Sequence, residues 1–103
     1  MFDDLLGNLQ KQQEELQQKL AGIFVEAESG DGAVVVKAGA DLHIKNIRID
    51  PAKLDLTDRE QLEDLLVVAT NRALELARQE AATESNKLLG SILPGGMDQF
   101  LKP

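Results

Sequence analysis

The chain has 103 residues and a mass of 11.2 kDa, which predicts a single small domain spanning residues 1–103. Its 18 acidic and 11 basic side chains give a net charge of −7 at pH 7 and a pI near 4.6. A uniformly acidic surface repels the phosphate backbone, so the composition alone does not favour a general nucleic-acid binder.

The residue types exclude several kinds of site. The absence of cysteine excludes disulfides and thiolate metal sites and fits a reducing cytoplasm, and one histidine cannot form a multi-histidine metal site within one chain. No apolar run approaches the ~18 residues of a transmembrane helix. The first residues also lack the basic and apolar regions of a signal peptide. We therefore expect an intracellular protein without a membrane segment.

The first twenty residues predict a helix. Strong helix formers fill residues 11–19, and a seam of mostly apolar residues recurs at alternating spacings of four and three. The polar member of this seam, Gln13, is either a register-fixing residue or the solvated end of a short seam. The seam consists of Phe2, Leu6, Leu9, Gln13, Leu16 and Leu20.

After Gly22 the hydrophobic period changes from 3.6 to 2, which predicts strands. Turn-forming residues at 29–32 and 39–41 separate these strands, because glycine and aspartate adopt the backbone conformations that hairpin turns require. We therefore expect a three-stranded antiparallel meander. Its strands are predicted at residues 23–28, 33–38 and 42–50.

The apolar residues of the third strand change from one face of the strand to the other along its length, because they move from even to odd positions. Ile44 lies on one parity, whereas Ile47 and Ile49 lie on the other. A β-bulge near Lys45 and Asn46 would reconcile the two halves, and burial of both faces of the strand would serve as well.

A long second helix follows the sheet. Pro51 ends the third strand, and Thr57 with Glu60 matches a capping box that starts the helix at Thr57. Nothing interrupts it before Leu89, which gives about 32 residues, or roughly 48 Å. A compact chain of this length has a diameter of only roughly 33 Å, so the helix is expected to extend beyond the rest of the domain.

The composition of this helix changes at Arg78. The preceding half is apolar on most sides, whereas the segment from Arg78 to Lys87 is polar all round. One small sheet and one further helix cannot cover so much apolar surface, and a homodimer can. The predicted fold class is therefore α+β, with an α-β-β-β-α protomer that dimerises.

No residue pattern predicts catalysis. His43 lies in an alternating strand without an evident partner, and Glu63 and Asp64 suit the positive end of a helix dipole. Asp31 stands between two glycines, where a turn residue is expected rather than a nucleophile. We expect no enzyme, no metal, no cofactor and no small-molecule substrate.

The order of these parts carries a family resemblance. A Gln- and Lys-rich first helix leads to a glycine-punctuated meander whose last strand ends Ile47-Arg48-Ile49-Asp50-Pro51. A helix containing Leu62-Glu63-Asp64-Leu65-Leu66 follows, and then a tail containing Leu93-Pro94-Gly95. In this order and length the chain resembles the YbaB/EbfC family of bacterial nucleoid-associated proteins over essentially its whole length. The resemblance implies a tweezer-shaped homodimer in the cytoplasm, associated with the nucleoid. It also implies binding of double-stranded DNA, largely without base specificity, between projecting helices.

The resemblance transfers a region of the protein rather than a set of contacts. Basic residues on the two helices are the expected phosphate contacts, which position the duplex without reading its sequence. These candidates are Lys11, Lys19, Arg72, Arg78 and Lys87, with Lys37, Lys45 and Arg48 in reserve on the strands. From the residues alone, these bases are instead expected to be solvated partners of nearby acids. Such pairs would be Arg78 with Glu75, and Lys87 with Glu80 and Glu84.

A different class of function is a protein-interaction module without direct DNA binding. The acidic balance favours it, as does an apolar segment at residues 90–103, which folds back or stays mobile. Its apolar residues are Ile92, Leu93, Met97, Phe100 and Leu101. The polar end of the long helix and this segment would then dock onto a partner.

Overall fold

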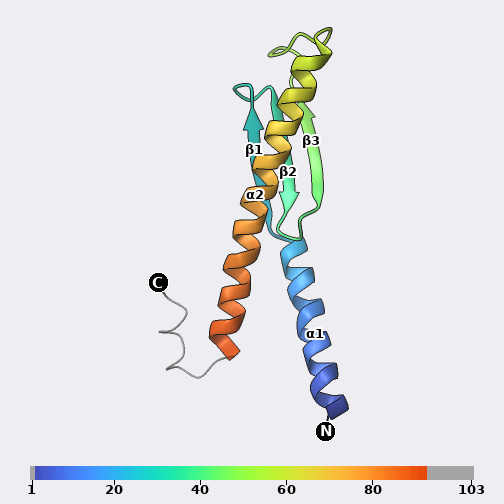
Figure 1. Ribbon diagram of the computed structural model, residues 1–103, viewed down its shortest axis with the longest axis vertical. Coiled ribbons are helices and arrows are strands. Elements are labelled where there is room, and N and C mark those ends of the chain that lie inside the picture. Colours follow the sequence, from blue (N-terminus) through green and yellow to red (C-terminus); the bar gives the residue numbers. More distant parts are fainter. Residues whose placement is uncertain (1, 93–103) are drawn as a thin grey trace.

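The computed structural model describes residues 2–92 and confirms the α+β class and the α-β-β-β-α order (Figure 1). The elements are α1 (Phe2–Ala21), β1 (Phe24–Ser29), β2 (Val34–Gly39), β3 (Ile44–Ile49) and α2 (Arg59–Ile92). The molecule measures 63 Å along its longest axis and 17 Å along its shortest, so it is a rod rather than a sphere. Residues 93–103, and with them most of the expected apolar tail, lie outside the described residues.

Helix α1 stands apart from the sheet. Its N-terminal turn carries Asp3 and Asp4 and its last turn carries Lys19, which suits the helix dipole at both ends. The helix ends at Ala21, where the Gly22 amide donates to the Lys19 carbonyl at 3.1 Å. Leu20 is the one buried residue of α1, and the preceding turns project away from the strands (Figure 1).

The three strands form an antiparallel sheet in the order β1-β2-β3, as expected for a meander. The β1–β2 turn runs through Gly30, Asp31 and Gly32, all with positive φ, which is why glycine flanks the aspartate there. In β3, Asn46 pairs with Lys37 and Ile44 pairs with Ala38, so Lys45 is the extra residue of a bulge. Of the two explanations left open for the change of face along this strand, the structure therefore shows the bulge.

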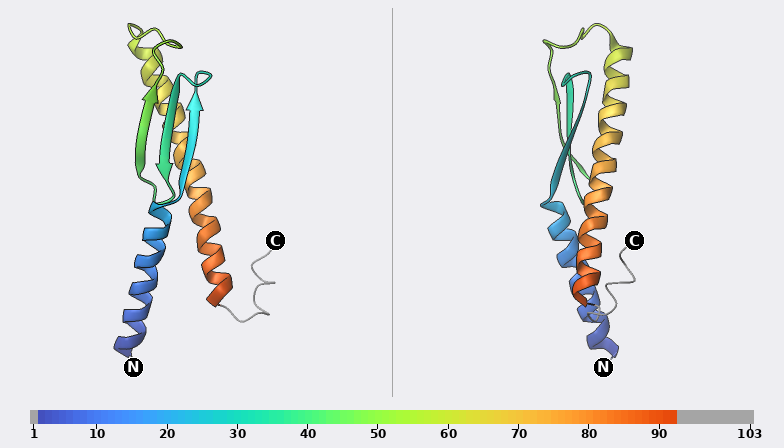
Figure 2. Two further views of the ribbon diagram at one scale, coloured as in Figure 1. Left: turned by 180° about the vertical axis from the view of Figure 1, so that it is seen from behind. Right: turned by 90° about the vertical axis from the view of Figure 1, so that its left-hand side faces the viewer.

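Helix α2 covers one face of β1 and β2 (Figure 2, right). Val34, Val36 and Ala38 of β2 are fully buried against three alanines of α2, which are spaced four residues apart. Alanine at these positions brings the helix axis close to the sheet. The three alanines are Ala69, Ala73 and Ala77.

Helix α2 begins one residue later than the predicted N-cap implies. Asp58 is the N-cap, because its Oδ1 accepts the Gln61 amide at 3.1 Å, and the helix starts at Arg59. Thr57 instead donates its hydroxyl to Asp55 Oδ1 within the preceding turn. The capping box at Thr57 was therefore wrong: an aspartate follows the threonine directly and is at least as good a cap.

Candidate nucleic-acid interface

Two helices project together from one end of the sheet. We call α1 and residues 78–92 of α2 the projecting helices; they run antiparallel beyond the strands, next to the turn that joins β2 to β3 (Figures 1 and 2). Helix α2 leaves the sheet because its core alanines end at Ala77 and its polar segment starts at Arg78. The expected extension of the long helix beyond the sheet is confirmed.

Four of the five candidate bases lie on the projecting helices, and three of these are lysines that stand beyond the end of the sheet. Lys11 and Lys19 are on α1 and Lys87 is on α2, and each is exposed. Within residues 2–92, Lys11 has no ion pair, whereas both other lysines bind the same carboxylate. Lys19 Nζ lies 2.8 Å from Glu84 Oε2, and Lys87 Nζ lies 3.2 Å from Glu84 Oε1.

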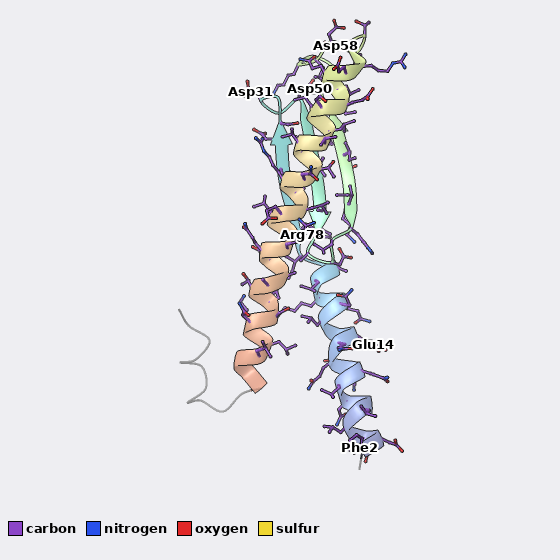
Figure 3. The ribbon with its side chains drawn as sticks, in the orientation of Figure 1. Phe2, Glu14, Asp31, Asp50, Asp58 and Arg78 are labelled. Atoms are coloured by element: carbon purple, nitrogen blue, oxygen red, sulfur yellow. The ribbon has the colours of Figure 1, made fainter. Side chains whose placement is uncertain are left out.

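The two arginines lie closer to the sheet. Arg78 is at the root of the projecting helices, level with the end of the sheet (Figure 3), and its Nη1 lies 3.4 Å from Glu75 Oε2. Arg72 donates from Nη1 to the Glu28 carbonyl at 2.9 Å, so it ties α2 to β1. The structure therefore brings Lys19 and Lys87 together at Glu84, with Lys11 farther out on α1, Arg78 at the root of the projecting helices and Arg72 apart from them.

Glu84 is the unusual residue of this region. Its side chain is only 8% exposed, although both of its lysine partners are more than 60% exposed. Hydrogen bonding by the ammonium group of Lys19, and next by that of Lys87, lowers the pKa of Glu84 below its ordinary value. The carboxylate lies in a cleft of about 370 Å³ between the helices. The cleft is lined by Gln12, Glu15, Leu16, Lys19, Glu84, Lys87 and Leu88.

Sequence reasoning found only part of this cluster. Helical spacing predicts the Glu84–Lys87 pair, which is present, and likewise the Glu75–Arg78 pair. It missed the pairing of Lys19 with Glu84, because spacing along one helix does not predict contacts between residues on different helices. One signal was available: α2 stays polar all round beyond Arg78, and a polar helix that runs beside another needs a charged partner.

The reserve bases are all on strands β2 and β3, and each has a partner. Lys37 Nζ stands 4.4 Å from the centre of the Phe24 ring, and Arg48 pairs with Glu26 at 3.5 Å. Lys45 Nζ lies 3.0 Å from Asp41 Oδ2. A hydrogen bond from Lys45 is the largest influence that lowers the pKa of Asp41, which ties the turn to the bulge.

The sheet also carries an uncovered apolar strip along β3. Ile49, Ile47 and Ile44 pair with Val34, Val36 and Ala38, so these isoleucines share the face that α2 covers over the other strands. Each remains 39–44% exposed, because α2 lies over β1 and β2. Nearby apolar side chains of α2 are also exposed, namely Val67, Val68 and Leu76.

The described part of the chain holds no cluster suited to a metal. Residues 2–92 contain no group of three or more acidic, histidine or cysteine side chains placed to bind an ion. In the same range, no helix is long and apolar enough to span a bilayer.

Comparison with known proteins gives a consistent set of relatives. Residues 1–92 match the YbaB/EbfC DNA-binding family. A nucleoid-associated protein of Clostridium novyi is 38% identical over 99 residues, covering 89% of this chain and 87% of the relative. A nucleoid-associated protein of Moorella thermoacetica is 42% identical over 81 residues, covering 78% of each chain.

One solved structure shares the fold. An uncharacterized protein from Helicobacter pylori matches with a TM-score of 0.72, covering 86% of this chain and 94% of that one. Its sequence identity is 22%, so the likeness concerns the fold alone.

Proposed function

The chain belongs to the YbaB/EbfC DNA-binding family, and we propose that it is a nucleoid-associated protein that binds duplex DNA as a homodimer. The binding is made through phosphate contacts with little base specificity. The observation that carries this proposal is the pair of projecting helices with Lys11, Lys19 and Lys87 exposed on them. The relatives are named nucleoid-associated proteins, which supports the same function and a place on the cytoplasmic nucleoid.

Phosphate contact is favoured because the candidate residues suit it. Lysine side chains on exposed helix faces reach charged oxygens without fixed geometry, and such contacts position a duplex without reading bases. Stacking on bases is disfavoured, since the chain has three phenylalanines and no tryptophan or tyrosine. Phe24 moreover lies under the ammonium group of Lys37 on the sheet.

Dimerisation is favoured by the uncovered strip on β3. Three isoleucines that share the core face of the sheet are left 39–44% exposed, and a second copy would cover them as α2 covers β1 and β2. A dimer would also present two pairs of projecting helices, which doubles the bases available to one duplex. Its net charge would be twice −7, or −14, so binding depends on where the lysines stand rather than on overall attraction.

The test is fluorescence anisotropy of a labelled random duplex of about 30 base pairs at several salt concentrations. With about four phosphates neutralised, log affinity should fall against log salt with a slope of roughly −3.6. Combined replacement of Lys11, Lys19 and Lys87 by alanine should weaken binding strongly and flatten the slope. The matched control replaces Lys37, Lys45 and Arg48, which removes the same charge from the strand region and should leave binding close to wild type.

Two results would overturn the proposal. A folded wild-type dimer that binds no duplex even at low salt would remove the function. Equal losses in the two triple variants would remove the assignment to the projecting helices and leave only a general charge effect.

The second candidate function is a protein-interaction module. The exposed apolar residues at the free end of α1 favour it: Phe2 is 76% exposed, and Leu5, Leu6 and Leu9 are about half exposed. Deletion of residues 90–103 separates the two functions. It should spare DNA binding under the first proposal and abolish capture of a protein partner under the second.

A further inference from the structure

The two projecting helices are joined mainly by one carboxylate. Leu20 is the only buried residue of α1, so apolar packing holds little of this helix against α2. Glu84 instead reaches from α2 to Lys19 of α1 at 2.8 Å, while its other oxygen lies 3.2 Å from Lys87 on its own helix. A single side chain thus engages one lysine on each helix.

The Glu84 carboxylate contacts two lysines that are also candidate contacts for a DNA backbone. Lys19 and Lys87 are two of the three lysines on the projecting helices, and their side chains are 61% and 66% exposed. Glu84 is only 8% exposed, so a phosphate can approach both ammonium groups from the solvent while the carboxylate holds them from inside the cleft. The lowered pKa of Glu84 means that it stays charged at neutral pH and competes with phosphate throughout the physiological range.

We propose that Glu84 is a clip that ties α1 to α2 through Lys19 and Lys87 and competes with DNA phosphates for these two lysines. When the duplex binds, its phosphates replace the Glu84 carboxylate as partners of the two lysines. The affinity for DNA is therefore lower than it would be if Glu84 carried no charge. The competition with DNA in this inference rests on the proposed function. The tie between the two helices does not depend on that function.

The size of the effect follows from the exposure of the lysines. An ion pair whose cation is exposed contributes little to stability, so a phosphate can replace the carboxylate as the partner of the lysine. Removing the charge of Glu84 should therefore tighten DNA binding by a modest factor, roughly 3- to 10-fold for two pairs. Glutamine is the suitable replacement, because it keeps the shape and one acceptor oxygen while removing the charge.

The experiment compares Glu84→Gln with Glu80→Gln in the anisotropy assay at one salt concentration. Both variants lose one negative charge from the same helix, one turn apart, but Glu80 forms no ion pair within residues 2–92. Glu84→Gln should bind roughly 3- to 10-fold more tightly than wild type, and Glu80→Gln less than twofold. Binding by Glu84→Gln that is no tighter than that of Glu80→Gln, or is weaker than wild type, overturns the inference.

A second measurement needs no DNA. The chain has no cysteine, so spin labels at Gln10→Cys and Asn86→Cys, on chains diluted with an excess of unlabelled chains, report the separation of the two helices within one chain. Both positions are exposed and neither lines the cleft. Glu84→Gln should broaden the distance distribution and Glu80→Gln should not, and equal distributions overturn the clip. If no form of the protein binds DNA, the proposed function fails, and this measurement still decides whether the clip exists.

Discussion

The two halves of α2 are held in place by different forces. Over the sheet, Ala69, Ala73 and Ala77 pack against fully buried valines, and the contact is apolar and close. Beyond the sheet, the same helix is held to α1 chiefly by the ion pair between Glu84 and Lys19. Apolar packing is insensitive to salt and pH and intolerant of added volume, whereas ion pairs are sensitive to both conditions and tolerant of volume.

This contrast suits a protein that keeps a fixed platform and adjustable binding elements. The buried half of α2 sets where the projecting helices begin, since Ala77 is the last residue of the core and Arg78 is at their root. The projecting half can then change its spacing without disturbing the core. Each substitution below should perturb either the platform or the projecting helices and leave the other unchanged.

The largest expected effect is on the uncovered strip of β3. Ile47→Asp places a charge at the centre of this strip, where a second copy would bury it, so the dimer should weaken at least about 100-fold, roughly 2.7 kcal/mol. Analytical ultracentrifugation over a concentration series measures this. Since Ile47 is 44% exposed in one chain, the monomer should keep its far-ultraviolet circular dichroism.

Asn46→Asp is the matched control for the strip. It adds the same charge to the same strand at the neighbouring position, whose side chain lies on the opposite face, so the dimer should persist. An Ile47→Asp variant that sediments as wild type would show that the strip is not the dimer contact.

The next effect concerns the apolar half of α2. Ala73→Leu adds three carbons where the helix is closest to the sheet and the alanine is fully buried, which should cost about 1–3 kcal/mol of unfolding free energy. Ala82→Leu makes the same change at an exposed position of the projecting half and should stay within about 0.5 kcal/mol of wild type.

Urea unfolding at one protein concentration compares the two variants, because the stability of a dimer depends on concentration. Equal losses would mean that the projecting half is packed as tightly as the core, contrary to the contrast drawn between them.

The sequence predicted the elements better than the contacts between them. Periodicity located both helices and all three strands, and the parity change at Ile47 allowed for the bulge, because these signals are local. The N-cap was misplaced by one residue because Thr57 and Asp58 are both good caps, and the choice depends on which side chain meets the Gln61 amide. The cross-helix pair of Lys19 and Glu84 depends on tertiary geometry, which spacing along the chain does not encode.

The smallest expected effect is the response of the helix pair to acid. Lys19 and Lys87 lower the pKa of Glu84, so this carboxylate favours the folded arrangement above its unfolded pKa, and that contribution is lost as pH falls through the folded value. The distance between labels at Gln10→Cys and Asn86→Cys should therefore stay narrowly distributed at neutral pH and broaden only at pH values below the ordinary glutamate range. Glu15 also lines this cleft, so Glu84→Gln is the control that separates the two acids. With Glu84→Gln the distribution should already be broad at neutral pH and change little on acidification, while labels across the α2–sheet contact should stay narrow in both proteins. A wild-type distribution that does not change down to the unfolding pH would show that packing, rather than charge, holds the projecting helices together.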